Sequence, residues 1–486
     1  MRKVLFVASE VYPLIKTGGL ADVAASLPRA LLKLGYDIKI LLPGYASLAA
    51  QVNEAGSREI AQFSIQGHEV RLLQTRLPGT RVTVLLVKTE LFSKREGNPY
   101  CGADGNDWRD NHKRFYLFAK VAETIALNRV ALDWQPDIVH CNDWQTGMVP
   151  ALLSQTPQRP ATVFTVHNLA YRGLFSHQAF FELGLPNDFW HHEKLEFYGQ
   201  MSFIKGGLIF ADAITTVSPS YAREIQTAEF GCGLDGVLRA RAQDLQGILN
   251  GIDMDEWNPG TDPLIHQTYN RRTLPQKVKN KTHLQQQLQL PVNESIPLLG
   301  FIGRLVEQKG VDLIVNQINQ LLALDCQLVI LGSGISHYEE ALQHIAHQHP
   351  DKVSLTLGYN EAFAHQIEAS ADLFLMPSVF EPCGLNQMYS LRYGTLPIVH
   401  AVGGLRDTIF EQALDSDSSS GTGFVFHQAT ATDLHDAIQR ALQYYRHPEK
   451  WKQLQQNAMK QNFSWEKSAE AYGSVYEDAL KKQQNK

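Results

Sequence analysis

Cysteine is scarce in this chain of 486 residues: there are five, an odd number, and no two of them form a CxxC pair. A disulfide framework and a zinc site built on paired cysteines therefore have no support, and the composition fits a reducing compartment. We expect a cytoplasmic protein. The motif HExxH is missing as well, so we predict no catalytic metal.

Long apolar runs are also missing, since no stretch approaches the ~18 consecutive apolar residues of a membrane-spanning helix. The opening MRKVLFVASE places two basic residues before an apolar run, but Ser9 and Glu10 end that run too early for the core of a signal peptide. We expect a buried first strand and no association with a membrane.

Neither sign of charge dominates: 44 Lys and Arg residues stand against 50 Asp and Glu residues, for a net charge of −6. This balance disfavours broad binding of nucleic acid. An anionic ligand would have to be held by local basic groups, so the informative cations are those at the ends of strands.

What the chain has is length and a repeated pattern of short β-branched runs between helical stretches. It is longer than the ~250–300 residues at which one core stops growing, so at least two domains are expected. The runs do not alternate strictly, which is typical of parallel strands covered on both faces. They predict strands near 3–9, 37–43, 137–142, 161–167 and 213–218, and again near 298–305, 327–334, 352–359, 372–378, 395–404 and 421–426.

The segment 247–281, rich in Asn, Asp and Pro, predicts a connector between two α/β domains. We place one α/β domain at 1–246, a second at 247–460 and a final helix at 461–486. The alternating segment 71–90 contains the turn-like Pro-Gly-Thr and predicts an antiparallel hairpin inserted in the first domain.

Ligands of open parallel sheets bind where the strands end, because loops and helix N-termini converge there. After the first strand comes Lys16-Thr17-Gly18-Gly19-Leu20, with a helix predicted from near Ala21. The glycines would let the backbone approach a phosphate, and the lysine adds a positive charge. The segment is neither GxGxxG nor a Walker A loop, which disfavours dinucleotide and ATPase functions. The alternative is a plain tight turn.

In the second half, Arg304 and Lys309-Gly310 follow a predicted strand and precede a helix predicted to start near Val311. Two cations at such a place would bracket a diphosphate, unless they are a solvated surface pair. Glu381-Pro382-Cys383-Gly384-Leu385 follows a later strand, where the carboxylate could accept hydrogen bonds from sugar hydroxyls. The alternative for Glu381 is an ordinary acid in the first turn of a helix.

Three polar side chains close strands of the first half: Asp143, His167 and Asn168. They could converge on a substrate, or each could cap a turn.

Taken in order, Lys16 to Leu20, His167-Asn168, Gly303-Arg304 with Lys309-Gly310, and Glu381 to Leu385 resemble the signature of bacterial glycogen synthases and plant starch synthases. The similarity covers nearly the whole chain. It implies the GT-B fold, two Rossmann-like domains facing across a cleft, with a final helix that crosses back to the first domain. It also implies transfer of glucose from ADP-glucose to the non-reducing end of an α-1,4-glucan, with retention of configuration and release of ADP.

The resemblance assigns roles residue by residue. Lys16, Gly18, Gly19 and Asp22 would bind the donor, Arg304 and Lys309 its diphosphate, and Tyr359 would stack on the adenine. Glu381 would contact the glucose hydroxyls with the backbone of Cys383, Gly384 and Leu385, while Asp143, His167 and Asn168 would line the sugar pocket and Asn250 would touch the reacting region. The expected catalytic residues are Lys16, His167, Arg304, Lys309 and Glu381.

Three positions depart from common patterns. Family members usually have Thr where this chain has Asn386, and many bacterial members have His where it has Asn142. Neither change removes a proposed charged group. The wider superfamily often has Glu where this chain, like its family, has Tyr389, so the ribose contacts must differ from the common scheme.

The departing diphosphate gains negative charge, so fixed cations would stabilise the transition state more than the ground state. No residue is clearly placed as the nucleophile of a double displacement, and we favour front-face attack in which the leaving phosphate accepts the acceptor's proton. We expect no cofactor besides the donor. Alternatives are a UDP-glucose-dependent or sucrose synthase-like transferase, a glucan phosphorylase with lysine-bound pyridoxal phosphate, and a non-catalytic glucan-binding protein.

Overall fold

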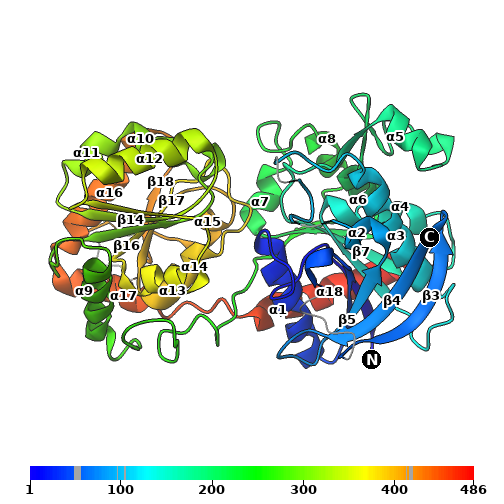
Figure 1. Cartoon of the computed structure of the whole chain (residues 1–486), viewed down its shortest axis with the longest axis horizontal. Helices are drawn as coiled ribbons and strands as arrows, with labels where there is room; N and C mark the ends of the chain where they lie inside the picture. Colours follow the sequence, from blue (N-terminus) through cyan, green and yellow to red (C-terminus); the bar gives the residue numbers. More distant parts are fainter. Residues whose placement is uncertain (49–55, 96, 103–104, 412, 415–419, 486) are drawn as a thin grey trace. The chain divides into compact units, whose positions relative to one another are not determined.

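The computed structural model describes residues 1–48, 56–95, 97–102, 105–411, 413–414 and 420–485. The chain divides into two compact units, one made of Met1–Gly251 with Trp465–Lys486 and the other of Ile252–Ser464. Each unit contains a sheet of mainly parallel strands with helices on both faces, which confirms the expected α/β class (Figure 1). The unit boundaries fall a few residues beyond the expected 246 and 460.

The large sheet of the first unit has the strand order β12-β11-β7-β6-β1-β2-β5-β4-β3. Its strands are parallel from β12 to β5, while β4 and β3 are antiparallel additions at one edge. The predicted hairpin is the pair β4–β5, and β3 extends it beyond the prediction. The bounds are β1 Lys3–Val7, β2 Asp37–Pro43, β3 Arg58–Ile65, β4 His68–Arg76, β5 Thr83–Lys88, β6 Ile138–Asn142, β7 Ala161–Val166, β11 Ala213–Thr216 and β12 Leu245–Gly247.

The order of the strands explains where a site can form in this unit. The chain builds outward from β1 through β2 to one side and from β6 through β7 to the other. At such a reversal the loops that follow neighbouring strands separate and leave a crevice at the carboxyl edge of the sheet. The loops after β1 and β6 are therefore the first place to look for ligand-binding side chains.

The last helix of the chain, α18 (Trp465–Gln484), returns to the first unit and packs against α1 (Gly19–Lys33) and β7. Its Tyr476 hydroxyl lies 2.8 Å from Nδ1 of the buried His140, which fastens the helix to the sheet. The other elements of this unit are α2 Glu90–Ser93, α3 Asn111–Ala126, α4 Met148–Leu153, α5 His177–Glu182, α6 Phe203–Phe210, α7 Pro219–Glu224, α8 Asp235–Ala240, and the small sheet of β8 Leu174–Ser176, β9 Glu196–Phe197 and β10 Gln200–Ser202.

The sheet of the second unit is parallel throughout, in the order β15-β14-β13-β16-β17-β18. Here the reversal lies between β13 and β16, so the loops after these two strands flank the corresponding crevice. All the strands predicted for this half are present. Their bounds are β13 Leu298–Ile302, β14 Gln327–Gly332, β15 Val353–Leu357, β16 Leu373–Met376, β17 Leu396–His400 and β18 Phe424–Phe426.

Two layers of helices enclose this sheet, with α10, α11, α12 and α16 on one face and α9, α13, α14 and α17 on the other (Figure 1). The helix predicted near Val311 begins at that residue. The bounds are α9 Lys277–Gln287, α10 Val311–Asn316, α11 Ile318–Leu322, α12 Ser336–Gln348, α13 Glu361–Ser370, α14 Asn386–Tyr393, α15 Gly403–Thr408, α16 Ala431–Tyr445 and α17 Pro448–Ala458.

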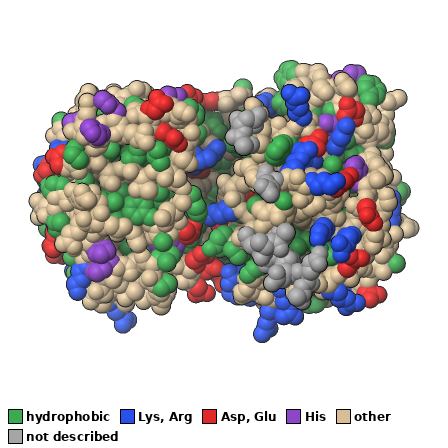
Figure 2. All heavy atoms as spheres, viewed as in Figure 1, with side chains coloured by type: hydrophobic (Ala, Val, Ile, Leu, Met, Phe, Trp, Pro, Cys, Tyr) green, Lys and Arg blue, Asp and Glu red, His purple; other side chains and the backbone are tan. Residues whose placement is uncertain are grey.

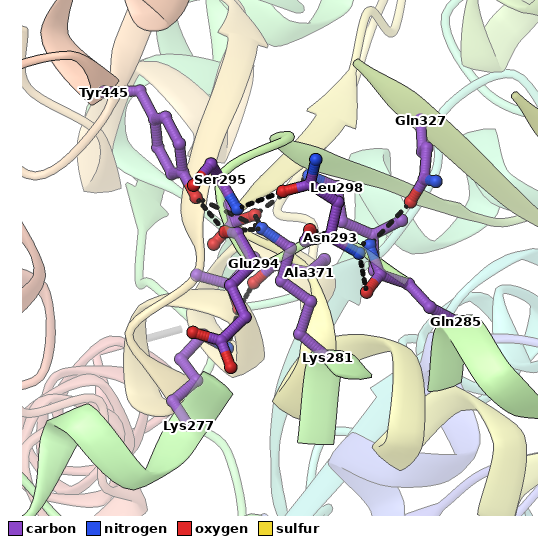
Figure 3. Close-up of polar contacts among 12 residues, drawn as sticks. Lys277, Lys281, Gln285, Asn293, Glu294, Ser295, Leu298, Gln327, Ala371 and Tyr445 are labelled. Carbon is purple, nitrogen blue, oxygen red and sulfur yellow. Dashed lines mark hydrogen bonds and ion pairs between the residues drawn. The ribbon is translucent and has the colours of Figure 1, made fainter. Parts of the chain in front are cut away.

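The predicted connector 247–281 is wrong at its end, because α9 already begins at Lys277. The helix is polar in sequence, yet several of its polar side chains are buried, and their contacts are drawn in Figure 3. Lys281 forms an ion pair of 2.7 Å with Asp372 and donates to the carbonyl oxygen of Glu294, while Gln285 donates to the side chain of Gln327 at 2.8 Å. Buried polar side chains thus replace the apolar stripe that would have marked the helix in the sequence.

No helix within the described ranges is long and apolar enough to cross a membrane. On the face drawn in Figure 2, acidic and basic side chains lie interspersed on both units.

Candidate active site

A buried glutamate shapes the loop between β1 and α1, which carries Lys16 to Leu20. Glu10 is 3% exposed, and its carboxylate accepts hydrogen bonds from the Thr17 amide, from Thr17 Oγ1 at 2.6 Å and from the Gly18 amide at 3.2 Å. The Tyr100 hydroxyl donates to the same carboxylate. The conformation of the loop therefore depends on one buried charge that meets several donors.

Glu10 and Tyr100 were not among the residues predicted from the sequence. An acidic residue shortly after a buried strand is a usable signal for Glu10, because a buried carboxylate needs local donors. Tyr100 lies about ninety residues away in the chain, and nothing in its sequence context marks it.

Within this loop the structure brings the predicted Lys16 and Asp22 together, with 2.9 Å between Lys16 Nζ and Asp22 Oδ1. Gly18 has an extended backbone with φ −159°, and a Cβ atom built there would meet nothing within 4 Å. Neither the backbone conformation nor packing requires glycine at this position. The open space beside it is available to a ligand that approaches the backbone closely.

The loops after β6 and β7 are tied together by Asp143. Its carboxylate oxygen Oδ1 accepts hydrogen bonds from the backbone amides of His167 at 2.7 Å and Asn168 at 3.3 Å. Asp143 itself has φ 57° and ψ −177°, a costly conformation for a residue other than glycine. Burial raises the pKa of Asp143 to about 7. The buried acid thus holds a strained turn that joins the two loops.

His167 is a neutral, oriented ring. Its Nε2 lies 2.9 Å from Oδ1 of the buried Asn142, whose amide nitrogen donates to the Val7 carbonyl oxygen at 3.0 Å. Since this bond leaves Oδ1 as the acceptor, Nε2 carries the proton and Nδ1 keeps its lone pair. Burial lowers the pKa of His167 to about 3, so the ring is uncharged at neutral pH. His167 can therefore accept a hydrogen bond from a hydroxyl group but brings no positive charge.

The two asparagines of the prediction differ in what they do. Oδ1 of Asn168 accepts from the Ala170 amide at 3.0 Å, so this side chain caps a turn, as one alternative predicted. Asn250 is 6% exposed, and its Oδ1 has no hydrogen-bond partner within the described part of the chain. A buried acceptor without a partner suits a donor that comes from outside the protein.

In the second unit, the loops after the neighbouring strands β13 and β16 bring Lys309 and Glu381 into contact. Lys309 Nζ and Glu381 Oε2 are 2.6 Å apart, and Ser378 Oγ donates to the same oxygen at 3.0 Å. Glu381 is 5% exposed and lies well before α14, which begins at Asn386, so it is not an ordinary acid of a first helical turn. Arg304, in the same loop as Lys309, donates to Gln308 at 3.0 Å.

Glycines allow these loops to touch. Gly310 has φ 70°, and a Cβ atom there would lie 2.0 Å from the Pro377 carbonyl oxygen. A Cβ atom at Gly403, at the start of α15, would lie 1.9 Å from the Glu381 carbonyl oxygen, which also accepts from the Gly404 amide at 3.1 Å. The glycine pair after β17 thus supports the Glu381 loop. No role was predicted for this pair, although two successive glycines at the end of a predicted strand are a recognisable signal.

The remaining predicted residues of this unit lie as follows. Cys383 is buried, Gly384 has φ 72° and Leu385 directly precedes α14. Tyr359 follows the edge strand β15 and is 68% exposed. Tyr389 stacks on Trp257 with ring centroids 3.7 Å apart, and is only 8% exposed.

The described residues contain no group of three or more His, Cys, Asp or Glu side chains that could hold a metal ion. Each unit instead has a lysine, in the loop after β1 or after β13, beside side chains that accept hydrogen bonds. Such cations suit phosphate groups, and the carboxylate and imidazole acceptors suit sugar hydroxyls.

Comparisons with known proteins agree with this chemistry. Residues 3–240 match the family model of the starch synthase catalytic domain, and residues 284–461 match that of the glycosyl transferases group 1. A glycogen synthase of Cellvibrio japonicus (strain Ueda107) is 67% identical over 98% of this chain and 99% of its own length. A glycogen synthase of Marinobacter nauticus is 53% identical, covering 99% and 98%.

A solved structure is also similar over the whole chain. The catalytic domain of starch synthase IV from Arabidopsis thaliana, bound to ADP and acarbose, has a TM-score of 0.88 and 34% identity, with 99% of both chains covered. The expected fold class, GT-B with two Rossmann-like domains, is confirmed by this likeness. A sucrose-phosphate synthase from Thermosynechococcus elongatus, at 17% identity and a TM-score of 0.62, shares the fold alone.

Proposed function

This chain belongs to the glycogen synthase and starch synthase family of glycosyltransferases, and we propose that it transfers glucose from ADP-glucose to the non-reducing end of an α-1,4-glucan, with retention of configuration and release of ADP. The donor is a nucleotide sugar and the acceptor a glucan such as glycogen. No cofactor takes part. We place the activity in the cytoplasm, in keeping with five free cysteines.

The observation that carries the proposal is the contact between Lys309 and Glu381 at the reversal of the second sheet. A lysine there can hold a phosphate oxygen, and the adjacent carboxylate can accept hydrogen bonds from sugar hydroxyls. A nucleotide sugar presents both groups within one short molecule.

The roles of the other residues follow from their chemistry. Arg304 and Lys16 supply further positive charge for the diphosphate, which becomes more negative as it departs. His167 accepts a hydrogen bond from a sugar hydroxyl through Nδ1, and Asn250 does so through its unpartnered Oδ1. Because burial lowers the pKa of His167 to about 3, its ring is a weak base, and the acceptor's proton goes to the leaving phosphate in a front-face attack. Tyr359 stacks on the base of the donor.

A coupled assay of nucleoside diphosphate release tests the proposal, with glycogen as acceptor and with ADP-glucose or UDP-glucose as donor. We expect release with ADP-glucose that falls by about a hundredfold in Lys16→Ala. The matched control is Lys33→Ala, which removes an exposed lysine from the last turn of α1, the helix that follows the Lys16 loop, and should behave as the wild type.

Each other result has a definite meaning. Release with UDP-glucose alone would overturn the donor assignment and favour the UDP-glucose-dependent alternative. No release with either donor, from folded protein that still binds glycogen, would favour a non-catalytic glucan-binding protein. Absorbance of a lysine-bound pyridoxal phosphate would favour a glucan phosphorylase.

A further inference from the structure

The second unit holds a pocket of about 420 Å³ that lies outside the candidate active site. One wall is the segment that precedes α9, and the other is α17 with Lys460, two residues beyond its end. The loops after β13 and β16 contribute nothing to it. The lining residues are Arg271, Arg272, Leu274, Pro275, Lys452, Gln456 and Lys460.

Basic side chains line this pocket, and no acidic side chain of the lining balances their charge. Four of its residues are Lys or Arg and none is acidic, although the chain as a whole has a net charge of −6. In the part of the chain that the structure describes, none of these four side chains forms an ion pair or a hydrogen bond. Lys16, Arg304 and Lys309 differ in this respect, because each has a protein acceptor beside it.

Both walls of the pocket rest on the end of α14. The Tyr269 hydroxyl donates to the Tyr393 carbonyl oxygen at 2.7 Å, and Gln455 Nε2 donates to the Gly394 carbonyl oxygen at 2.8 Å. The turn that carries the two arginines is ordered in addition by Asn270, whose Oδ1 accepts from the Arg272 amide at 2.9 Å. The cations are therefore presented by a fixed framework.

A simpler account explains only part of this cluster. Lys460 follows the C-terminus of α17, where a positive charge is favourable because of the helix dipole. That effect does not explain the two arginines, which come from a segment nearly two hundred residues earlier in the chain. Four like charges around one cavity repel one another unless an anion lies between them.

We propose that this pocket binds a small polyanion, a phosphorylated metabolite, at a site separate from the donor site. The planar guanidinium groups of Arg271 and Arg272 can each hold a phosphate by paired hydrogen bonds, and Lys452 and Lys460 add charge from the opposite wall. Leu274 and Pro275 give apolar surface to the rest of the ligand, and Gln456 can bind a hydroxyl group. The volume lies in the range of pockets that take small metabolites.

Binding of radiolabelled inorganic pyrophosphate to the full chain, measured by equilibrium dialysis, tests this proposal. Because the donor site also has phosphate-binding cations, we expect about two pyrophosphate molecules per wild-type chain. Arg272→Gln with Lys460→Gln should weaken one of the two sites by at least tenfold. The charge-matched control, Lys279→Gln with Arg446→Gln, changes two exposed cations of the same unit outside the pocket and should keep both sites.

The converse variant, Arg304→Gln with Lys309→Gln, should keep the pocket site and weaken the other. All of the pocket and control substitutions are at exposed positions, and thermal melting shows that the variants are folded. Pyrophosphate binding that is unchanged in the pocket variant, or weakened equally in the control, would overturn the proposal. So would loss of all binding in the Arg304→Gln, Lys309→Gln variant. None of these results depends on the identity of the sugar donor.

Discussion

The two units present a lysine at the corresponding place of their sheets but support it differently. In the first, the carboxylate of Glu10 holds the backbone of the loop, and Lys16 pairs with a different acid, Asp22. In the second, Lys309 pairs directly with Glu381, the acid proposed to bind the sugar. In the first unit, the acid that fixes the loop is thus not the ion-pair partner of the lysine proposed to bind phosphate. In the second unit, one acid is both the partner of that lysine and the group proposed to bind the sugar.

The charge states of the neighbouring groups extend this contrast. In the first unit, burial keeps His167 neutral and raises the pKa of Asp143 to about 7. Such groups suit hydroxyls rather than phosphates. The second unit supplies Arg304 and Lys309, which suit phosphates. We infer that the second unit contributes most of the stabilisation of the leaving diphosphate, and the first contributes more to the orientation of the sugar.

Replacing Lys309 tests this inference with the largest expected effect. Lys309→Ala removes a cation from the diphosphate and also leaves the buried Glu381 without its partner, so kcat/KM should fall by about a thousandfold. Lys16→Ala, which leaves Glu10 and its loop intact, should cost about a hundredfold. Steady-state kinetics with ADP-glucose and glycogen compare the two. A larger loss in Lys16→Ala than in Lys309→Ala would reverse the proposed division of labour.

The second test addresses the buried acid of the first unit. The folded state keeps the proton of Asp143 up to about pH 7, whereas the unfolded chain loses it near the ordinary value of 3.8. Wild-type stability should therefore contain a component that decreases as pH rises through this window, by at most about 1.4 kcal/mol per pH unit. Asp143→Asn keeps the acceptor oxygen but does not titrate.

The difference in unfolding free energy, variant minus wild type, should accordingly increase between about pH 4 and pH 7 and then stay level. Urea unfolding at a series of pH values measures it. Asp478→Asn, at an exposed site on α18 of the same unit, is the control and should show no such trend. A constant difference for Asp143→Asn across the range would mean that the carboxyl is already ionised at low pH.

The strands could be predicted from the sequence because apolar runs and the residues that end them are local features, and the charged residues proposed for the site were chosen by the same local signal. The strand order, which neighbouring residues do not encode, decides that Lys309 meets Glu381. Contacts between residues far apart in the chain could not be predicted. An example is the hydrogen bond from the Tyr100 hydroxyl to Glu10, two residues that are ninety positions apart. The start of α9 could not be predicted either, because the buried face of this helix is polar and gives no periodic apolar signal.

The third prediction concerns the support of the first loop. Glu10→Gln replaces a charged acceptor of two backbone amides with a neutral one, and its NH₂ group must face one of the present donors. We expect kcat/KM for ADP-glucose to fall by about tenfold, mainly through KM, as the loop loses its fixed geometry. Thr17→Ser keeps both the amide and the hydroxyl bound by Glu10 and should remain near wild type. Full activity of Glu10→Gln would show that the loop does not need this charge.

The smallest expected effect falls on the base of the donor, at the edge of the second sheet. Because the Tyr359 ring is 68% exposed, its removal leaves no cavity, and the variant should differ from wild type only in donor binding. Tyr359→Ala should raise the KM for ADP-glucose about fivefold, the loss of one stacking contact of about 1 kcal/mol, and leave kcat unchanged. Tyr359→Phe keeps the ring and should retain the wild-type KM. Tyr198→Ala, which removes a similarly exposed ring from the first unit, is the matched control and should not alter the donor KM. An unchanged KM in Tyr359→Ala would mean that the second unit binds the diphosphate and the sugar but does not bind the base through Tyr359. Another residue would then have to account for the preference for ADP-glucose.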